Sequence, residues 1–137
     1  MDEKLFYRAV KNGDLDAVRN ALAENPALVS IRDVEQSTPL HYAAWKGHAE
    51  VLVALLDAGA DIHAHNQNDH WGTTALHAAA HANNRAIVEI LLQRGADVNS
   101  PRSNSPQTPL DETKAHKATA AAKVLIAAGG RYSASES

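Results

Sequence analysis

Pairs of adjacent apolar residues, each followed four positions later by a second pair, form the most regular pattern in the chain. The pattern occurs at Val51/Leu52 and Leu55/Leu56, at Ile87/Val88 and Leu91/Leu92, and at Ala121/Ala122 and Leu125/Ile126. A spacing of i, i+1, i+4 and i+5 places all four side chains on one face of an α-helix. We therefore predict three amphipathic helices that each bury one side and expose the other.

A shorter segment that opens on a threonine precedes each of these helices. The three segments are Thr38-Pro39-Leu40-His41, Thr74-Ala75-Leu76-His77 and Thr108-Pro109-Leu110-Asp111. Threonine is a favoured N-cap, and proline is tolerated in the first helical turn because its missing N–H has no partner there. Each segment therefore predicts a second, short helix. The threonines are 36 and 34 residues apart, so the chain repeats a two-helix unit.

The first 33 residues form a fourth unit that lacks the threonine opening. When they are shifted by 34 positions, Ala9 falls on Ala43, Gly13 falls on Gly47, and the later apolar pairs also coincide. A terminal unit has one face in water instead of against a neighbour, so its sequence is expected to be atypical. The last unit is also atypical, as a cap at the other end would be.

These segments resemble the ankyrin repeat, whose units open on Thr-Pro-Leu-His and recur at about 33 residues. The resemblance covers about residues 4 to 132. It implies an all-α fold, a solenoid of stacked helix-turn-helix units joined by β-hairpin-like loops. We expect one domain over residues 1–132, with repeats at about 4–33, 34–69, 70–103 and 104–132, and a disordered tail over residues 133–137.

The chain departs from the family pattern in its loops. The glycine expected before the threonine is kept only at Gly72, and Gln36 and Pro106 replace it elsewhere. The loop between the two middle units is three residues too long, and we expect Asn66-Gln67-Asn68 to be the excess. The next loop has one extra residue near Arg102. Lys117 stands where Gly13, Gly47 and Asn83 stand in the other units, so we expect the turn there to be strained or differently shaped.

Composition narrows the classes of function. The chain has no cysteine, which excludes disulfides and thiol catalysis and fits the reducing cytoplasm. The net charge of −3 gives no basic footprint for nucleic acid. No apolar run approaches the length of a signal or membrane segment, so we expect no membrane partner. Phosphate-binding and nucleophile motifs are also missing, so we expect neither an enzyme nor a cofactor.

Eight histidines raise the alternative of a metal-binding protein. His41 and His77 belong to the repeat opening, and we expect them to be structural. His63, His65 and His70 share one long polar loop, which Asp69 or His81 could complete as a zinc, nickel or copper site. The spacing matches no defined ligand motif, so solvation or adventitious binding of nickel is the simpler interpretation.

The resemblance also implies a binding surface, the concave face, made of the hairpin tips and the exposed sides of the first helices. Both tryptophans fall on this face outside any core position, which is informative because exposed tryptophan is uncommon and often anchors a partner. The alternative is that they only shield the stack. By register, the candidate partner-binding residues are Glu35, Ser37, Trp45, Lys46, His65, His70, Trp71, Thr73, His81, Asn104, Gln107 and His116.

We therefore expect a protein–protein interaction module, an adaptor or inhibitor that is monomeric when alone and binds a protein or peptide on its concave face. A synthetic binder built on an ankyrin scaffold is a further alternative, and the missing cysteine suits it. The unequal loops and the Lys117 turn oppose it, because engineered repeats are usually uniform.

Overall fold

A computed structural model describes residues 2–67, 72–115 and 117–133 of the chain. The described residues form eight α-helices and one 3-10 helix. The helices are α1 (Glu3–Asn12), α2 (Leu15–Glu24), η1 (Pro26–Ser30), α3 (Pro39–Lys46), α4 (Ala49–Asp57), α5 (Ala75–His81), α6 (Arg85–Gln93), α7 (Pro109–Ala115) and α8 (Thr119–Ala127).

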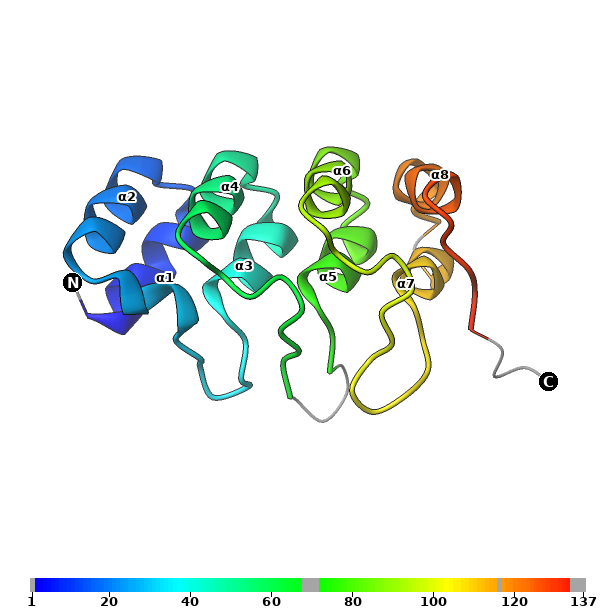
Figure 1. The fold of residues 1–137 in the computed structure, drawn as a ribbon, viewed down its shortest axis with the longest axis horizontal. Coiled ribbons are helices and arrows are strands. Elements are labelled where there is room, and N and C mark those ends of the chain that lie inside the picture. The colour runs from blue at the N-terminus through cyan, green and yellow to red at the C-terminus, as the bar shows by residue number, and fades with distance from the viewer. Residues whose placement is uncertain (1, 68–71, 116, 134–137) are drawn as a thin grey trace.

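The helices form two rows, as Figure 1 shows. The inner helices α1, α3, α5 and α7 contact one another in sequence order, and the outer helices α2, α4, α6 and α8 do the same. Each inner helix also packs on the outer helix that follows it in the chain. The fold is thus the predicted all-α solenoid of stacked helix pairs, and the described residues contain no β-strand.

The apolar pairs found in the sequence build the core between the rows. Leu52, Leu55, Ile87, Leu91 and Leu125 are all fully buried. Neighbouring units cover one another's apolar pairs, so one buried core runs along the stack, whereas Ile126 on the last helix is 56% exposed.

The turn inside each unit needs a residue with positive φ. Gly13, Gly47, Asn83 and Lys117 occupy this position with φ of 71°, 80°, 55° and 49°. At Gly47 a side chain is also excluded by close packing. A Cβ atom there would lie 2.7 Å from the side-chain amide nitrogen of Asn84 in the next unit. Lys117 keeps the left-handed conformation of the other turns, which is costly for a residue with a Cβ, so this turn is strained and not differently shaped.

Long loops join the units and lie along one edge of the inner row (Figure 1). Each loop is closed by a backbone hydrogen bond, from Asp33 N–H to Ser37 C=O (3.1 Å), from Asn66 to Thr73 (3.0 Å) and from Arg102 to Gln107 (3.0 Å). Neighbouring loops are also joined, since Gln67 N–H donates to Glu35 C=O and Ser103 N–H donates to Gly72 C=O. The loops therefore form one connected surface beside the inner helices.

These bonds correct one prediction about the long loop. Asn66 is not part of the excess, because its backbone and side chain bond to Thr73 in the way that Asp33 bonds to Ser37. The inserted residues therefore follow Asn66, and Asn68 lies outside the described residues. Gln36, which replaces a glycine, has a φ of 62°.

The end of the chain departs from the predicted disordered tail at its first residue. Ser133 donates its backbone N–H to Asp111 Oδ2 at 3.0 Å. Residues 134–137 lie outside the described part of the chain.

Candidate functional site

The repeat opening Thr-x-Leu-His ties each unit to the next. Thr38 N–H donates to His41 Nδ1 (3.1 Å), and His41 Nε2 lies 2.8 Å from the Thr73 carbonyl of the following loop. A carbonyl only accepts, so the ring proton is on Nε2. His77 repeats this arrangement. Thr74 N–H donates to His77 Nδ1 (3.2 Å), and His77 Nε2 lies 3.0 Å from the Gln107 carbonyl. Both histidines are structural, as the sequence predicted.

Burial keeps both rings neutral. Removal of the ring from water lowers the pKa of His41 to about 4 and the pKa of His77 to about 4, although each bond to a loop carbonyl acts in the opposite direction. In the charged ring, Nδ1 would also carry a proton. That proton would point at the backbone N–H of Thr38 or Thr74, which donates to Nδ1 in the neutral ring. The two rings therefore present uncharged surfaces at neutral pH.

The last unit replaces this histidine with Asp111. Its Oδ2 accepts from Thr108 N–H at 2.8 Å and from Ser133 N–H at 3.0 Å. Burial alone would raise the pKa of Asp111, but the hydrogen bonds from Thr108 and Ser133 outweigh it and hold the pKa below its usual value. Asp111 thus caps its helix and holds the chain that follows α8.

The next residue along each inner helix differs from unit to unit. Tyr42 donates its hydroxyl to Asp33 Oδ2, and Glu112 pairs with the guanidinium of Arg102, whose Nε lies 2.8 Å from Oε2. Asp33 and Arg102 are the residues that begin the loop closures, so both pairs fasten an inner helix to its own loop. The unit of α5 lies between these two, and we call it the middle unit. It has Ala78 at this position, whose side chain is too short to reach Asn66.

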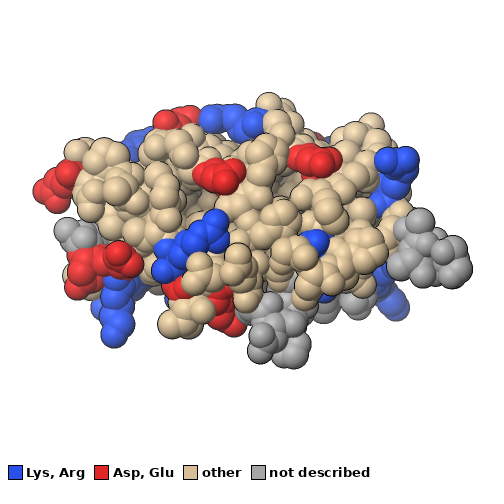
Figure 2. Space-filling model, turned by 60° about the horizontal axis from the view of Figure 1, so that its bottom comes forward, with Lys and Arg blue, Asp and Glu red and all other residues tan. Residues whose placement is uncertain are grey.

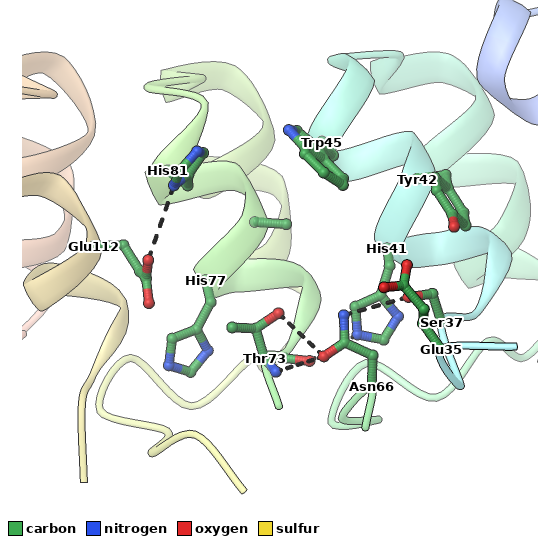
Figure 3. A pocket seen from close by; sticks show the side chains of 11 residues that line it. Glu35, Ser37, His41, Tyr42, Trp45, Asn66, Thr73, His77, His81 and Glu112 are labelled. Atoms are coloured by element: carbon green, nitrogen blue, oxygen red, sulfur yellow. Dashed lines mark hydrogen bonds and ion pairs between the residues drawn. The ribbon is translucent and has the colours of Figure 1, made fainter. Parts of the chain in front are cut away.

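A pocket of about 160 Å³ lies beside this alanine, and we call it the central pocket. Figure 3 shows it between α3 and α5, with loop residues below it. Asn66 accepts there from Thr73 N–H (2.7 Å) and donates to Ser37 Oγ (3.3 Å), which fixes that wall. The lining residues are Glu35, Ser37, His41, Tyr42, Trp45, Asn66, Thr73, His77, Ala78, His81 and Glu112.

Trp45 and His81 lie on facing sides of the central pocket, on α3 and α5 (Figure 3). They hold equivalent positions in adjacent units, as the sequence predicted. Trp45 is 55% exposed. His81 Nδ1 is 3.9 Å from Glu112 Oε1, so His81 is oriented toward α7. An exposed indole beside a pocket is a surface that a partner can cover.

The other predicted site residues fall into three groups. Glu35, Ser37 and Thr73 line the central pocket, but the last two are buried and contribute only as its wall. Lys46, Asn104 and Gln107 are exposed but do not line the pocket. His65 is half-buried, with Nε2 2.8 Å from the Pro101 carbonyl. The predictions for His70, Trp71 and His116 lie outside the described residues.

Sequence reasoning missed the residues that shape the pocket. Tyr42, Asn66, Ala78 and Glu112 were not among the candidates, although all four line it. Comparison of the residue four places after each threonine gives Tyr42, Ala78 and Glu112 and shows the small residue in the middle unit. The small residue at this position was therefore the sequence feature that could have indicated the pocket.

Charge and metal chemistry add little to this surface. Figure 2 shows basic and acidic side chains scattered among uncharged ones on the face that it draws, without a continuous basic stripe. Within residues 2–67, 72–115 and 117–133, no group of three His, Cys, Asp or Glu side chains is placed to hold a metal ion. The predicted ligands Asp69 and His70 lie outside these ranges. No helix in the described ranges is long and apolar enough to cross a membrane.

Models of known protein families match most of the chain. The model described as "Ankyrin repeats (3 copies)" matches residues 2–66. The model described as "Ankyrin repeat" matches residues 71–103. The matched segments contain α1 to α6 and the loops that surround the central pocket.

Similar curated proteins carry this segment in different contexts. Identity is 41% over 70 residues with serine/threonine-protein kinase VIK of Arabidopsis thaliana, which is 51% of this chain and 15% of the kinase. It is 39% over 61 residues with Ankyrin repeat domain-containing protein 49 of Homo sapiens, which is 44% of this chain and 26% of that protein. It is 44% over 66 residues with potassium channel KOR1 of Oryza sativa subsp. japonica, which is 48% of this chain and 7% of the channel. The chain thus spans about a quarter or less of the length of these relatives.

Proposed function

Since the chain belongs to the ankyrin repeat family, whose repeats are generally non-enzymatic modules for protein–protein interaction, we propose that it is an adaptor or inhibitor that binds a protein or peptide on its concave face. The observation that carries this proposal is the exposure of Trp45 beside the central pocket. Burial of such an indole in an interface removes a large apolar area from water and commonly gives a binding hot spot.

The proposed surface is centred on the two middle units. Trp45 and His81 are its anchors, Glu35 and Lys46 border it, and Gln107 lies on the loop that His77 holds. The rigid attachment of each loop to the preceding inner helix keeps the surface preformed. A preformed surface loses less conformational entropy when a partner binds.

A capture experiment with a matched control tests the proposal. Wild-type protein, Trp45→Ala and Ile126→Ala are each immobilised and exposed to lysate of the source organism, and bound proteins are quantified by mass spectrometry. Ile126 lies on α8 and is 56% exposed, so its removal deletes a similarly exposed apolar side chain far from the pocket. We expect Trp45→Ala alone to lose the partner, with a cost of about 2 kcal/mol or more in binding free energy.

Circular dichroism separates binding from folding in this experiment. Because Trp45 is exposed, its replacement should leave helical content and melting temperature nearly unchanged. Equal loss of capture with Ile126→Ala, or unfolding of Trp45→Ala, would contradict the proposal.

We also propose that the protein is a monomer when alone and resides in the cytoplasm. The absence of cysteine supports a reducing compartment. Light scattering after size exclusion tests the first statement, with a mass near 14.6 kDa expected for the monomer.

A further inference from the structure

We propose that the central pocket receives one arginine side chain of the partner, stacked on Trp45 and paired with Glu35. This inference rests on the proposed function, because it names the chemistry by which the concave face would select its partner. It is carried by the size of the pocket, by the sign of the charge around it and by the aromatic ring at its side.

The volume of the pocket suits a single side chain. At about 160 Å³ it is close in size to engineered protein cavities of ~150 Å³ that hold one benzene molecule. Sites for drug-sized ligands and cofactors are roughly 300–1,000 Å³. The volume of the pocket therefore matches one side chain of a partner.

The uncompensated charge at the pocket is negative. His41 and His77 are neutral, because burial lowers the pKa of each ring to about 4. Glu112 is already neutralised by Arg102. Glu35 is exposed, and its carboxylate forms no ion pair with any residue that the structure describes. Glu35 thus provides the charge that a cationic group would complement.

The nearby basic side chains have other contacts. Lys11 Nζ lies 4.5 Å from the centroid of the Tyr42 ring, and Arg32 donates to the carbonyls of Gln36 and His65, both at 2.8 Å. Lys46 follows Trp45 but does not line the pocket. A cation from outside the chain can therefore occupy the pocket without replacing an internal one.

Trp45 favours arginine over lysine as the occupant. The planar guanidinium stacks on an indole face and can form two parallel hydrogen bonds with a carboxylate, whereas an ammonium group does neither as well. The apolar stem of arginine would contact Ala78, which lines the pocket. One side chain would thus satisfy both the aromatic and the acidic parts of the lining.

The repeat itself supplies a variant that closes the pocket. The neighbouring units hold Tyr42 and Glu112 at the position of Ala78, so this helical position accepts a long side chain. Ala78→Tyr should fill the pocket and leave the fold intact. Its folding is checked by circular dichroism before any binding measurement.

A selection from a random-peptide display library tests the inference and the proposed function separately. Peptides are selected on wild-type protein and then sorted by loss of binding to Ala78→Tyr and to Trp45→Ala. An arginine shared by the peptides that need both residues is the expected result. Peptides that need Trp45 but share a leucine or phenylalanine instead would overturn the inference and leave the proposed function standing. The absence of any peptide that depends on Trp45 would overturn both.

A thermodynamic cycle then tests the contact with Glu35. Arginine in a selected peptide is replaced by citrulline, which keeps the shape and removes the charge, and affinity is measured by calorimetry on wild type and on Glu35→Gln. We expect citrulline to weaken binding to wild type about tenfold and to Glu35→Gln much less. Glu50→Gln, an exposed change on α4, serves as the charge-matched control and should retain the full effect. An equal effect of citrulline on wild type and Glu35→Gln would overturn the assignment of Glu35.

Discussion

The inner helices α5 and α7 begin alike and differ in the two residues that follow the shared leucine. In α5 these residues are His77, which bonds forward to the Gln107 carbonyl, and Ala78, which leaves space for the central pocket. In α7 they are Asp111, which holds the chain after α8, and Glu112, which is buried against Arg102. One helix thus faces a following unit and an open pocket, and the other closes the end of the described stack.

The difference follows from what each position must bond to. Inside the stack, the residue after the leucine must accept an N–H on one side and donate to a carbonyl of the next loop on the other. Neutral histidine does both with one ring, whereas an ionised carboxylate only accepts. Asp111 accepts the backbone N–H of Ser133, and the nearby Arg131 carbonyl accepts from the Thr108 hydroxyl instead, so a carboxylate is sufficient there.

The largest expected effect is a loss of stability in mild acid, which separates the histidine units from the aspartate unit. His41 and His77 have a pKa of about 4 when folded and 6.5 when unfolded, so the unfolded chain binds more protons between these values. The free energy of unfolding should therefore be near its full value above pH 6.5 and fall by about 6 kcal/mol by pH 4. Urea unfolding at several pH values measures it.

The variant His77→Asn sharpens this measurement. With one buried ring removed, the number of protons taken up on unfolding between pH 6.5 and 4 should drop by about one. Asp111 acts in a different range, because its folded pKa lies below the usual value of 3.8 for an aspartate and its contribution is lost only below that pH. An unchanged pH slope in His77→Asn would show that His77 is not the titrating group.

Truncation of the two residues to alanine should give unequal losses of stability. His77→Ala removes a fully buried ring and leaves the Thr74 N–H and the Gln107 carbonyl without their partner, at a cost of about 2–4 kcal/mol. Asp111→Ala removes a cap at the end of the stack, at a cost of about 1 kcal/mol. Chemical denaturation of both proteins at pH 7 measures the two values, and equal losses would refute the distinction.

The repeat architecture could be predicted because it depends on local sequence. Helix faces follow from the spacing of apolar pairs, caps from threonine, and turns from the residue in the left-handed position, so the helices α3 to α6 were predictable. Lys117 was correctly identified as strained for the same reason. Each of these features is decided within about one helical turn of the residue concerned.

The pocket could not be predicted, because it depends on contacts between units. The side chain of Asn66 bonds to Ser37, 29 residues away, and this contact makes it a structural residue and not part of an insertion. Glu112 was not singled out from the sequence, and its role depends on its pairing with Arg102, ten residues before it in the chain. Trp45 drew attention to the surface on which the pocket lies, but Ala78 beside it carries no signal unless the units are compared position by position.

A smaller effect is expected at the turn between α7 and α8. Lys117→Gly relieves the positive φ of 49° and should raise the free energy of unfolding by about 0.5–1 kcal/mol. Gly47→Ala, at the same position in an earlier unit, should destabilise, since its φ is 80° and the new Cβ would meet the Asn84 side chain at 2.7 Å. Thermal unfolding of both variants should give shifts of opposite sign, and shifts of the same sign would contradict this account of the turn.

The smallest effect on stability should come from Ala78→Tyr, the change that makes the middle unit resemble its neighbour. Tyr42 shows that the position accepts an aromatic ring, and Ala78 is only half-buried, so the free energy of unfolding should change by less than about 0.5 kcal/mol. Because the new ring would occupy the central pocket, the same change should abolish binding of a partner that inserts a side chain there. Urea unfolding and calorimetry on one sample measure both quantities. A large loss of stability would mean that the open position in the middle unit is required by the stack, and full binding by a normally folded variant would mean that the pocket is not used.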